Sequence, residues 1–489
     1  MKTKIILFLI ILVSVLLRIY GIEDKNLWFD EVYSWKLSQH SIIEIVSLTS
    51  GDIHPPLFYI ILKFWTGIFS DSILSMRMLS TMFGILSILF LYKLSKIFLK
   101  NDIQILFVIL IYMVSPLNIF YSQEVRMLNL NLFLCLGSVY YFFKFKENQN
   151  FKTGAIYVFF SVLAIYTHYF ALLIIISQLV IALSEYLFNG KDRKSLFNYL
   201  KYFFTIFVFY IPWIRVFINQ VTKGQPWRTE QSLRQVGKNL LDYFKDIFLS
   251  NYFTFESNAL MIFASVFSIF IILFLVFSVI KILNERSFFS RKENMIFLIF
   301  LIPLVIALII SFRQSIVLSR YLSIILPYLF ISLVYFIFKQ FKPKAAYSLS
   351  IFLILVSCYG TYINYNNKFK NNDYRKIISY IEKNYSEGDV IIAEPHFMGW
   401  SIDYYVDHND TEIKKPEVLG WDLNMQIDSL RKLNYINNVW VITDYSSLDN
   451  TQYDSLNFIM QDLDFRRKQK KSFYLIPSKV NVEYYSKTN

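Results

Sequence analysis

Long apolar runs occupy most of this chain from residue 5 to residue 363. About eleven of them approach the ~20 residues that an α-helix needs to cross a bilayer. They lie near 5–20, 74–98, 104–120, 127–143, 154–170, 171–188, 202–218, 257–280, 295–312, 321–338 and 345–363. Because helices satisfy their own backbone groups inside a bilayer, this pattern predicts an α-helical polytopic membrane protein with about eleven spans.

The charge balance of the chain fits that interpretation. Hydrophobic residues make up 55% of the sequence and charged residues only 17%, whereas about 25% of the residues in a soluble domain are charged. This composition excludes an ordinary soluble enzyme and a disordered chain. The formal net charge is +13, which would also suit a nucleic-acid-binding protein.

The basic residues, however, gather at every second junction between the apolar runs. The clusters are Lys2/Lys4, Lys93/Lys96/Lys100, Lys144/Lys146/Lys152, Lys191/Arg193/Lys194/Lys201, Lys281/Arg286/Arg291/Lys292 and Lys339/Lys342/Lys344. Lys and Arg accumulate in the cytoplasmic loops of membrane proteins. We therefore expect these junctions and the N-terminus in the cytoplasm, and no nucleic-acid partner.

Three segments are then expected outside the cytoplasm, at 21–73, 219–256 and 364–489. The apolar stretch 57–69 is short and carries Lys63, and counting it as a span would reverse every later loop. We interpret it as a helix lying in the outer interface, so that the first outer loop 21–73 contains interfacial helices. No small-residue cleavage site follows the first apolar run, which favours an uncleaved first span over a signal peptide.

The sequence divides into a membrane domain, 1–363, and a polar tail, 364–489. The tail alternates helix-like and strand-like stretches, namely 373–385, Asp389–Ala393, 425–434, Val439–Thr443, 452–463 and Ser472–Ile476. Such alternation predicts a small C-terminal extracytoplasmic α/β domain. No glycine-rich phosphate loop accompanies it, so a nucleotide site in the tail is unsupported.

Charged residues on the predicted outer face form three ordered motifs. The first outer loop contains Trp28-Phe29-Asp30-Glu31 and then His54-Pro55-Pro56-Leu57, and the third span is followed by Tyr121-Ser122-Gln123-Glu124-Val125-Arg126. Arg77 opens one span and Arg320 lies at the outer end of another. Because the bilayer penalises charge, such residues at the ends of spans are candidates for function.

Taken together, these motifs resemble the family 39 branch of the GT-C membrane glycosyltransferases. That branch includes the protein O-mannosyltransferases, whose pattern His54-Pro55-Pro56-Leu57 follows, and the lipid A aminoarabinose transferases, which have a Glu-Lys pair in place of Ile53-His54. The resemblance is strongest over 1–170 and implies a GT-C-like fold with a polyprenyl-phosphate sugar as donor. It also implies a glycan, lipid or protein acceptor on the outer side, and an aspartate base that maps onto Asp30.

Physical chemistry supports the same reaction. Sugar transfer from a lipid phosphate to a hydroxyl needs a base near the hydroxyl and positive charge near the leaving phosphate. We assign the catalytic role to Asp30 with Glu31, which otherwise caps or orients a helix. The candidates for donor phosphate and substrate binding are His54, Arg77, Glu124, Arg126 and Arg320, each of which has a structural alternative such as an ion pair or interfacial anchoring.

The sequence decides neither whether a metal ion is bound nor between several alternative functions. Asp30, His54 and Glu124 would suit Mg²⁺ or Mn²⁺ if the fold brought them together, and no metal is assigned. His168, at a span end, is expected to be an interfacial polar residue outside the site.

The functional alternatives are a transporter or flippase of lipid-linked saccharides, which the one-sided ionisable cluster disfavours, and a diphosphate-dependent ligase. The tail offers a binding module. In a bacterium the chain is expected in the plasma (inner) membrane.

Overall fold

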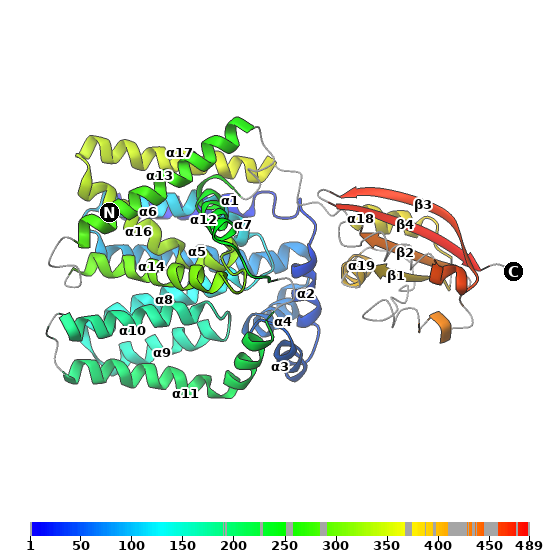
Figure 1. The fold of residues 1–489 in the computed structure, drawn as a ribbon, viewed down its shortest axis with the longest axis horizontal. Helices are drawn as coiled ribbons and strands as arrows, with labels where there is room; N and C mark the ends of the chain where they lie inside the picture. The colour runs from blue at the N-terminus through cyan, green and yellow to red at the C-terminus, as the bar shows by residue number, and fades with distance from the viewer. Residues whose placement is uncertain are drawn as a thin grey trace. The chain divides into compact units, whose positions relative to one another are not determined.

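The computed structural model describes residues 2–188, 190, 193–224, 228–250, 258–283, 291–366, 374–386, 388–394, 398–408, 428, 430–432, 436, 438–444, 458–475 and 478–487. The chain forms two compact units (Figure 1). The first comprises Met1–Ile22, His40–Ser70 and Ser75–Asn366, and the second comprises Glu23–Gln39, Asp71–Leu74 and Asn367–Asn489. Part of the first outer loop therefore clusters with the tail.

The first unit is helical. Its elements are α1 (Lys2–Ile19), α3 (Ile42–Gly51), α4 (Leu57–Phe69), α5 (Ile73–Phe98), α6 (Asp102–Val114), α7 (Pro116–Ser122), α8 (Leu128–Asn148), α9 (Phe151–Ile165), α10 (Ala171–Phe188), α11 (Arg193–Lys223), α12 (Leu233–Leu249), α13 (Asn258–Leu283), α14 (Lys292–Ser311), α15 (Ser319–Leu322), η3 (Ser323–Ile325), α16 (Leu326–Gln340) and α17 (Pro343–Asn366). Its long helices run side by side (Figure 1).

The prediction of a polytopic helical membrane protein is confirmed. Within the described residues, eight helices are long and apolar enough to cross a membrane, and the bent pair α6–α7 makes a ninth. Helices α1 and α9, which cover two more of the predicted runs, are apolar but shorter. The stretch 57–69 is helical, as α4. Its position in the outer interface stays a prediction.

The predicted span 104–120 is broken where α6 gives way to α7, with a bend of 55°. Pro116 lacks an N–H and disfavours helical geometry at the preceding Ser115, whose ψ is 119°. Helix α17 satisfies the backbone at the break, because the Thr361 hydroxyl donates to the Val114 carbonyl at 2.7 Å and the Asn364 amide to the Pro116 carbonyl at 2.9 Å. A break at membrane depth is stable only with such partners.

The basic junctions gather at one end of the bundle. Lys146, at the end of α8, forms an ion pair with Glu185, at the end of α10. The Gln149 amide donates to the Ser195 hydroxyl at 2.6 Å, which joins the α8–α9 connection to the start of α11. This common end is what the alternating charge clusters predicted. Its assignment to the cytoplasm rests on the positive-inside rule.

The second unit is built on a four-stranded sheet with the order β1-β2-β4-β3. Its elements are α2 (Phe29–Ser38), α18 (Tyr374–Glu382), β1 (Val390–Glu394), α19 (Met398–Asp407), β2 (Asn438–Asp444), β3 (Phe465–Leu475) and β4 (Ser478–Lys487). Strands β1 and β2 are parallel, and the other pairs are antiparallel. The small α/β region predicted for the tail is confirmed, although the sequence did not predict α19 or β4. Of the two other helix-like stretches, 458–462 of 452–463 is helical, and so are the described residues 428 and 430–432 of 425–434; the other residues of 425–434 and residues 452–457 lie outside the described residues.

The two faces of this sheet are packed differently. On one face, Val390, Ile392, Val439 and Val441 join a buried cluster with Met460 and other apolar side chains. On the other face, the Trp440 ring lies 4.6 Å from the Tyr484 ring and 6.0 Å from the Tyr380 ring of α18, measured between centroids. The sheet is therefore covered on both sides at its parallel pair β1–β2, as parallel strand pairs usually are.

Candidate functional site

Two buried histidines lie together in the first unit, at the end of the bundle opposite the basic junctions. His54 ends the connection between α3 and α4, and His168 lies between α9 and α10. The two connections are joined by the Leu57 N–H, which donates to the Tyr166 carbonyl at 3.1 Å. The imidazole centroids are 5.3 Å apart, and both side chains are buried.

Three arginines surround this histidine pair. Burial lowers the pKa of His54 well below its usual range, and neighbouring groups, which include the cations Arg126, Arg320 and Arg228, lower it further. Burial and the same three guanidinium groups lower the pKa of His168 to about 3. Both imidazoles are therefore neutral at physiological pH, and the positive charge of the cluster comes from arginine.

Tyr321 of α15 brings these groups together. The Arg228 guanidinium donates to its phenolic oxygen at 2.6 Å. The guanidinium carbons of Arg228 and Arg320 lie 5.1 and 5.0 Å from the Tyr321 ring centroid, and the His168 ring lies 5.4 Å away. Cations at these distances are attracted by the electron-rich face of the ring. One aromatic side chain thus contacts two cations and one imidazole.

Two buried nitrogens of this cluster can donate a hydrogen bond to a ligand. The Phe170 N–H donates to Nδ1 of His168 at 3.2 Å, so the neutral ring carries its proton on Nε2. Within the described part of the chain, neither His168 Nε2 nor Arg228 Nε has a hydrogen-bond partner. Buried donors rarely stay unsatisfied. Each of these nitrogens can therefore donate to an anionic ligand.

Helix α12 holds the short helix that carries Arg320 and Tyr321. The Ser319 hydroxyl donates to the Asp246 carboxylate at 2.6 Å, and the Tyr243 hydroxyl donates to the Leu322 carbonyl at 3.2 Å. Burial raises the pKa of Asp246 to about 6, against the opposing charge of Lys245, whose ammonium lies 3.6 Å away. Both contacts fix the direction in which α15 presents its side chains.

An apolar cavity lies beside the histidine pair. Its volume is about 670 Å³, and its walls come from α3, α4, α11 and the end of α9. Pro56 and Leu57, two and three residues after His54, line it together with Tyr166, Trp213 and Val216. The cavity is large enough for several isoprene units and has walls of matching polarity.

Arg77 and Glu124 lie at the same end of the bundle. Glu124 is buried, and its carbonyl accepts from the Arg126 N–H at 2.8 Å. The Ser80 hydroxyl of α5 donates to the Arg126 carbonyl at 3.3 Å. Arg77, one turn earlier in α5, donates to the Ile22 carbonyl at 2.5 Å. The contacts therefore place Ser80 against the Arg126 segment and Arg77 against Ile22, three residues after the end of α1.

Asp30 and Glu31 belong to α2, which is part of the second unit. The Glu31 side chain is buried and accepts from the Trp28 N–H at 3.3 Å, which closes the start of the helix. The Asp30 side chain is half-buried. Phe29 and Tyr33 pack on Trp400 of α19 with ring centroids 5.7 and 5.5 Å away. Asp30 thus lies on a helix anchored by aromatic contacts.

The structure brings together three of the predicted site residues, His54, Arg126 and Arg320. It adds His168, which the sequence analysis placed outside the site, and Arg228, which it did not single out. Both lie in connections that the predicted topology puts on the same face as Arg126, and this was the available signal. Among the described residues, no three His, Cys, Asp or Glu side chains are placed to hold one metal ion.

Comparisons with known proteins bear on the family likeness and the fold. Residues 53–215, a third of the chain, match the family model described as dolichyl-phosphate-mannose-protein mannosyltransferase. No curated protein sequence matches the chain.

Several solved structures share its architecture. ArnT from Cupriavidus metallidurans bound to undecaprenyl phosphate has a TM-score of 0.60 at 11% identity, over 97% of each chain. AglB, an oligosaccharyltransferase from Archaeoglobus fulgidus solved with an inhibitory peptide and a dolichol-phosphate, has a TM-score of 0.54 at 13% identity, over 91% of this chain and 69% of its own. The arabinofuranosyltransferase AftD from Mycobacteria has a TM-score of 0.52 at 10% identity, over 99% of this chain and 40% of its own.

The chain therefore has the fold of the GT-C membrane glycosyltransferases. The resemblance inferred from its motifs is confirmed, and it is an integral multi-pass membrane protein.

Proposed function

We propose that this protein transfers one sugar from a polyprenyl-phosphate donor to an acceptor hydroxyl on the extracytoplasmic side of the membrane. The observation that carries the proposal is the pair of unsatisfied buried donors, His168 Nε2 and Arg228 Nε, among three arginines. The lipid phosphates in the ArnT and AglB structures support a donor of this class.

The arginine cluster suits a leaving phosphate. As the bond between the sugar and the phosphate breaks, negative charge grows on the phosphate oxygens, and guanidinium groups bind such oxygens bidentately. Arg126, Arg228 and Arg320 supply that charge, and neutral His168 donates a further hydrogen bond. Because the site is buried, these interactions are stronger than they would be in water.

The lipid chain of the donor has a place next to this cluster. The cavity of about 670 Å³ is lined by Pro56 and Leu57, two and three residues after His54. A polyprenyl chain buries apolar surface there while its phosphate faces the arginines. At about 25 cal/mol per Å² of apolar area, a few isoprene units contribute several kcal/mol to binding.

On the acceptor side we assign Asp30 as the base, as the resemblance implies. The acceptor oxygen forms a bond with the anomeric carbon, the bond from that carbon to the phosphate oxygen breaks, and the hydroxyl proton passes to the Asp30 carboxylate. Glu31 then acts as a positioning residue, because its carboxylate closes the start of the helix. Arg77 and Glu124 are proposed to complete the substrate-binding side.

The test uses purified protein and a panel of radiolabelled polyprenyl-phosphate monosaccharides, with and without EDTA, scored as release of polyprenyl phosphate. Asp30→Asn should abolish release from the preferred donor. Asp24→Asn, an exposed acid in the same segment, serves as the matched control and should retain it. An Asp30→Asn protein with full activity would refute the assigned base.

The same preparation discriminates the alternatives. Binding and turnover of a lipid-diphosphate saccharide in preference to every monophosphate donor would identify a diphosphate-dependent ligase. Movement of a lipid-linked sugar across liposomes without covalent transfer would identify a flippase. If no monophosphate donor binds, the proposed donor class is wrong.

A further inference from the structure

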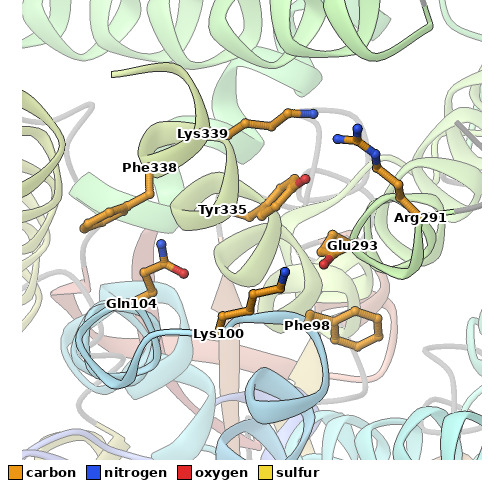
Figure 2. Close-up of a pocket in the computed structure, with 8 residues that line it drawn as sticks. All are labelled: Phe98, Lys100, Gln104, Arg291, Glu293, Tyr335, Phe338 and Lys339. Atoms are coloured by element: carbon orange, nitrogen blue, oxygen red, sulfur yellow. The ribbon is translucent and has the colours of Figure 1, made fainter. Parts of the chain in front are cut away.

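A second basic site lies in the first unit, far from the cluster around Tyr321. A pocket of about 480 Å³ is lined by Phe98, Lys100, Gln104, Arg291, Glu293, Tyr335, Phe338 and Lys339 (Figure 2). Its walls come from the α5–α6 connection, the start of α14 and the end of α16. Three separate segments of the chain thus each contribute one cation to one pocket.

The polar ends of these side chains face a common space. In Figure 2 the Lys339 ammonium and the Arg291 guanidinium point toward each other, and the Lys100 ammonium points into the pocket from the opposite wall. The Lys339 ammonium lies 5.7 Å from the Tyr335 ring centroid. Among the described residues that line the pocket, Glu293 is the one acid, beside the three cations Lys100, Arg291 and Lys339.

The pocket lies at the other end of the bundle from the proposed transferase site. Helix α5 carries Arg77 near its start and Phe98 at its end, a separation of about 30 Å at 1.5 Å per residue. Arg320 likewise precedes α16, and Lys339 is its penultimate residue. The two sites therefore cannot share one phosphate group.

We propose that this pocket binds the phosphate of an anionic molecule, most simply the head group of a glycerophospholipid in the leaflet at the basic end of the bundle. Three cations at the ends of spans match a phosphate diester, and basic pockets between transmembrane helices bind such head groups. The aromatic rings of Phe98, Tyr335 and Phe338 offer contact to the glycerol and upper acyl chain. A free phosphate would use the same cations.

The inference does not depend on the sugar-transfer reaction, and its test needs no donor. Full-length protein in detergent is titrated with dioleoyl phosphatidylglycerol, dioleoyl phosphatidylcholine or inorganic phosphate, and binding is followed by native mass spectrometry and by the melting temperature. The variants are Lys100→Gln, Arg291→Gln and Lys339→Gln. Lys342→Gln and Lys344→Gln remove the same charge from exposed positions at the same end, outside the pocket.

We expect each pocket variant to weaken phosphatidylglycerol binding about tenfold, as the loss of a charge-assisted hydrogen bond would, and each control to change it less than twofold. Arg291→Lys, which keeps the charge and loses the planar fork, should fall between the two. Inorganic phosphate that displaces phosphatidylglycerol at millimolar concentration would identify the free anion as a ligand of the same site.

Two results would overturn the proposal. One is equal binding of phosphatidylglycerol by the pocket variants and the two controls, and the other is binding of phosphatidylcholine as tight as that of phosphatidylglycerol. The melting temperature of each variant without lipid shows whether it is folded. Arg291→Lys keeps the test valid if Arg291→Gln is unstable.

Discussion

The Arg228 guanidinium donates a hydrogen bond of 2.6 Å to the Tyr321 hydroxyl, which joins the segment after α11 to α15 across 93 residues of sequence. The same tyrosine ring contacts Arg320 and His168. Tyr321 therefore fixes the position of two cations and one imidazole at once. An arginine held in this way loses little rotamer freedom when a phosphate binds, which favours affinity.

Replacing Arg228 should weaken use of the donor. We expect Arg228→Gln to lower kcat/KM for the polyprenyl-phosphate sugar about 100-fold, since a charge-assisted contact to phosphate contributes about 3 kcal/mol. Arg228→Lys should recover part of the loss, because lysine keeps the charge without the fork. Initial rates over a range of donor concentrations measure both. Arg313→Gln, an exposed arginine between α14 and α15, is the matched control. Rates for Arg228→Gln within twofold of the native protein would contradict the assignment.

The low pKa of His168, about 3 against an ordinary 6.5, predicts how stability depends on pH. The unfolded chain binds a proton at His168 near pH 6.5 and the folded protein does not, so the contribution of His168 to stability is complete above that pH and is lost as the pH falls toward 3. The loss is about 1.4 kcal/mol per pH unit. His168→Gln should reduce the fall of the melting temperature between pH 6.5 and 4.5, with His54 still contributing to it, and His40→Gln should not reduce it. Parallel curves for the native protein and His168→Gln would refute this prediction.

Much of the first unit could be predicted because hydropathy and charge act over whole helices. The apolar runs and the alternating basic clusters set the helices and their common end, and the ordered motifs placed His54, Arg126 and Arg320 on one face. The break at Pro116 was not predicted, since its carbonyl partner Asn364 lies far away in the sequence. Pro116 alone did not show whether the run bends or continues.

The residues that were missed owe their role to tertiary contacts. Arg228 lies outside every recognisable motif, and only its contact with Tyr321 reveals its place in the cluster. Strand β3 was predicted only over its last residues, because 466–471 are charged or polar and exposed. Such charge is usual for an edge strand, where it discourages pairing with other chains. Whether Asp30 is the base stays a prediction.

The buried carboxylate of Asp246 should reduce stability at neutral pH. Its pKa rises from 3.8 to about 6 on folding, so the folded protein keeps the proton at higher pH than the unfolded chain. The contribution of Asp246 to stability is therefore most favourable below about pH 4, falls by up to about 3 kcal/mol as the pH rises to 6, and stays level above.

Asp246→Asn removes this charge and keeps an acceptor for the Ser319 hydroxyl. We expect it to melt at a higher temperature than the native protein at pH 7.5 and at the same temperature near pH 4. The charge of Asp242, on a more exposed face of the same helix, helps to raise the pKa of Asp246, so Asp242→Asn should weaken the pH dependence without removing it. An Asp246→Asn protein that melts lower at pH 7.5 would show that the ionised carboxylate stabilises the fold.

Close packing of α17 on α12 should make Gly360 intolerant of any side chain. A Cβ atom there would lie 2.4 Å from the Phe248 carbonyl oxygen and 2.7 Å from Leu249 Cα, and backbone atoms cannot rotate away. Gly360→Ala should therefore lower the free energy of unfolding by about 3 kcal/mol. In Gly237→Ala the new methyl meets no atom within 4 Å, so this change in α12 should raise stability by up to about 1 kcal/mol. Thermal melting of both variants in the same detergent measures the contrast. Equal melting temperatures would mean that the two helices separate easily at Gly360, and that α12 is not held there as tightly as the contacts indicate.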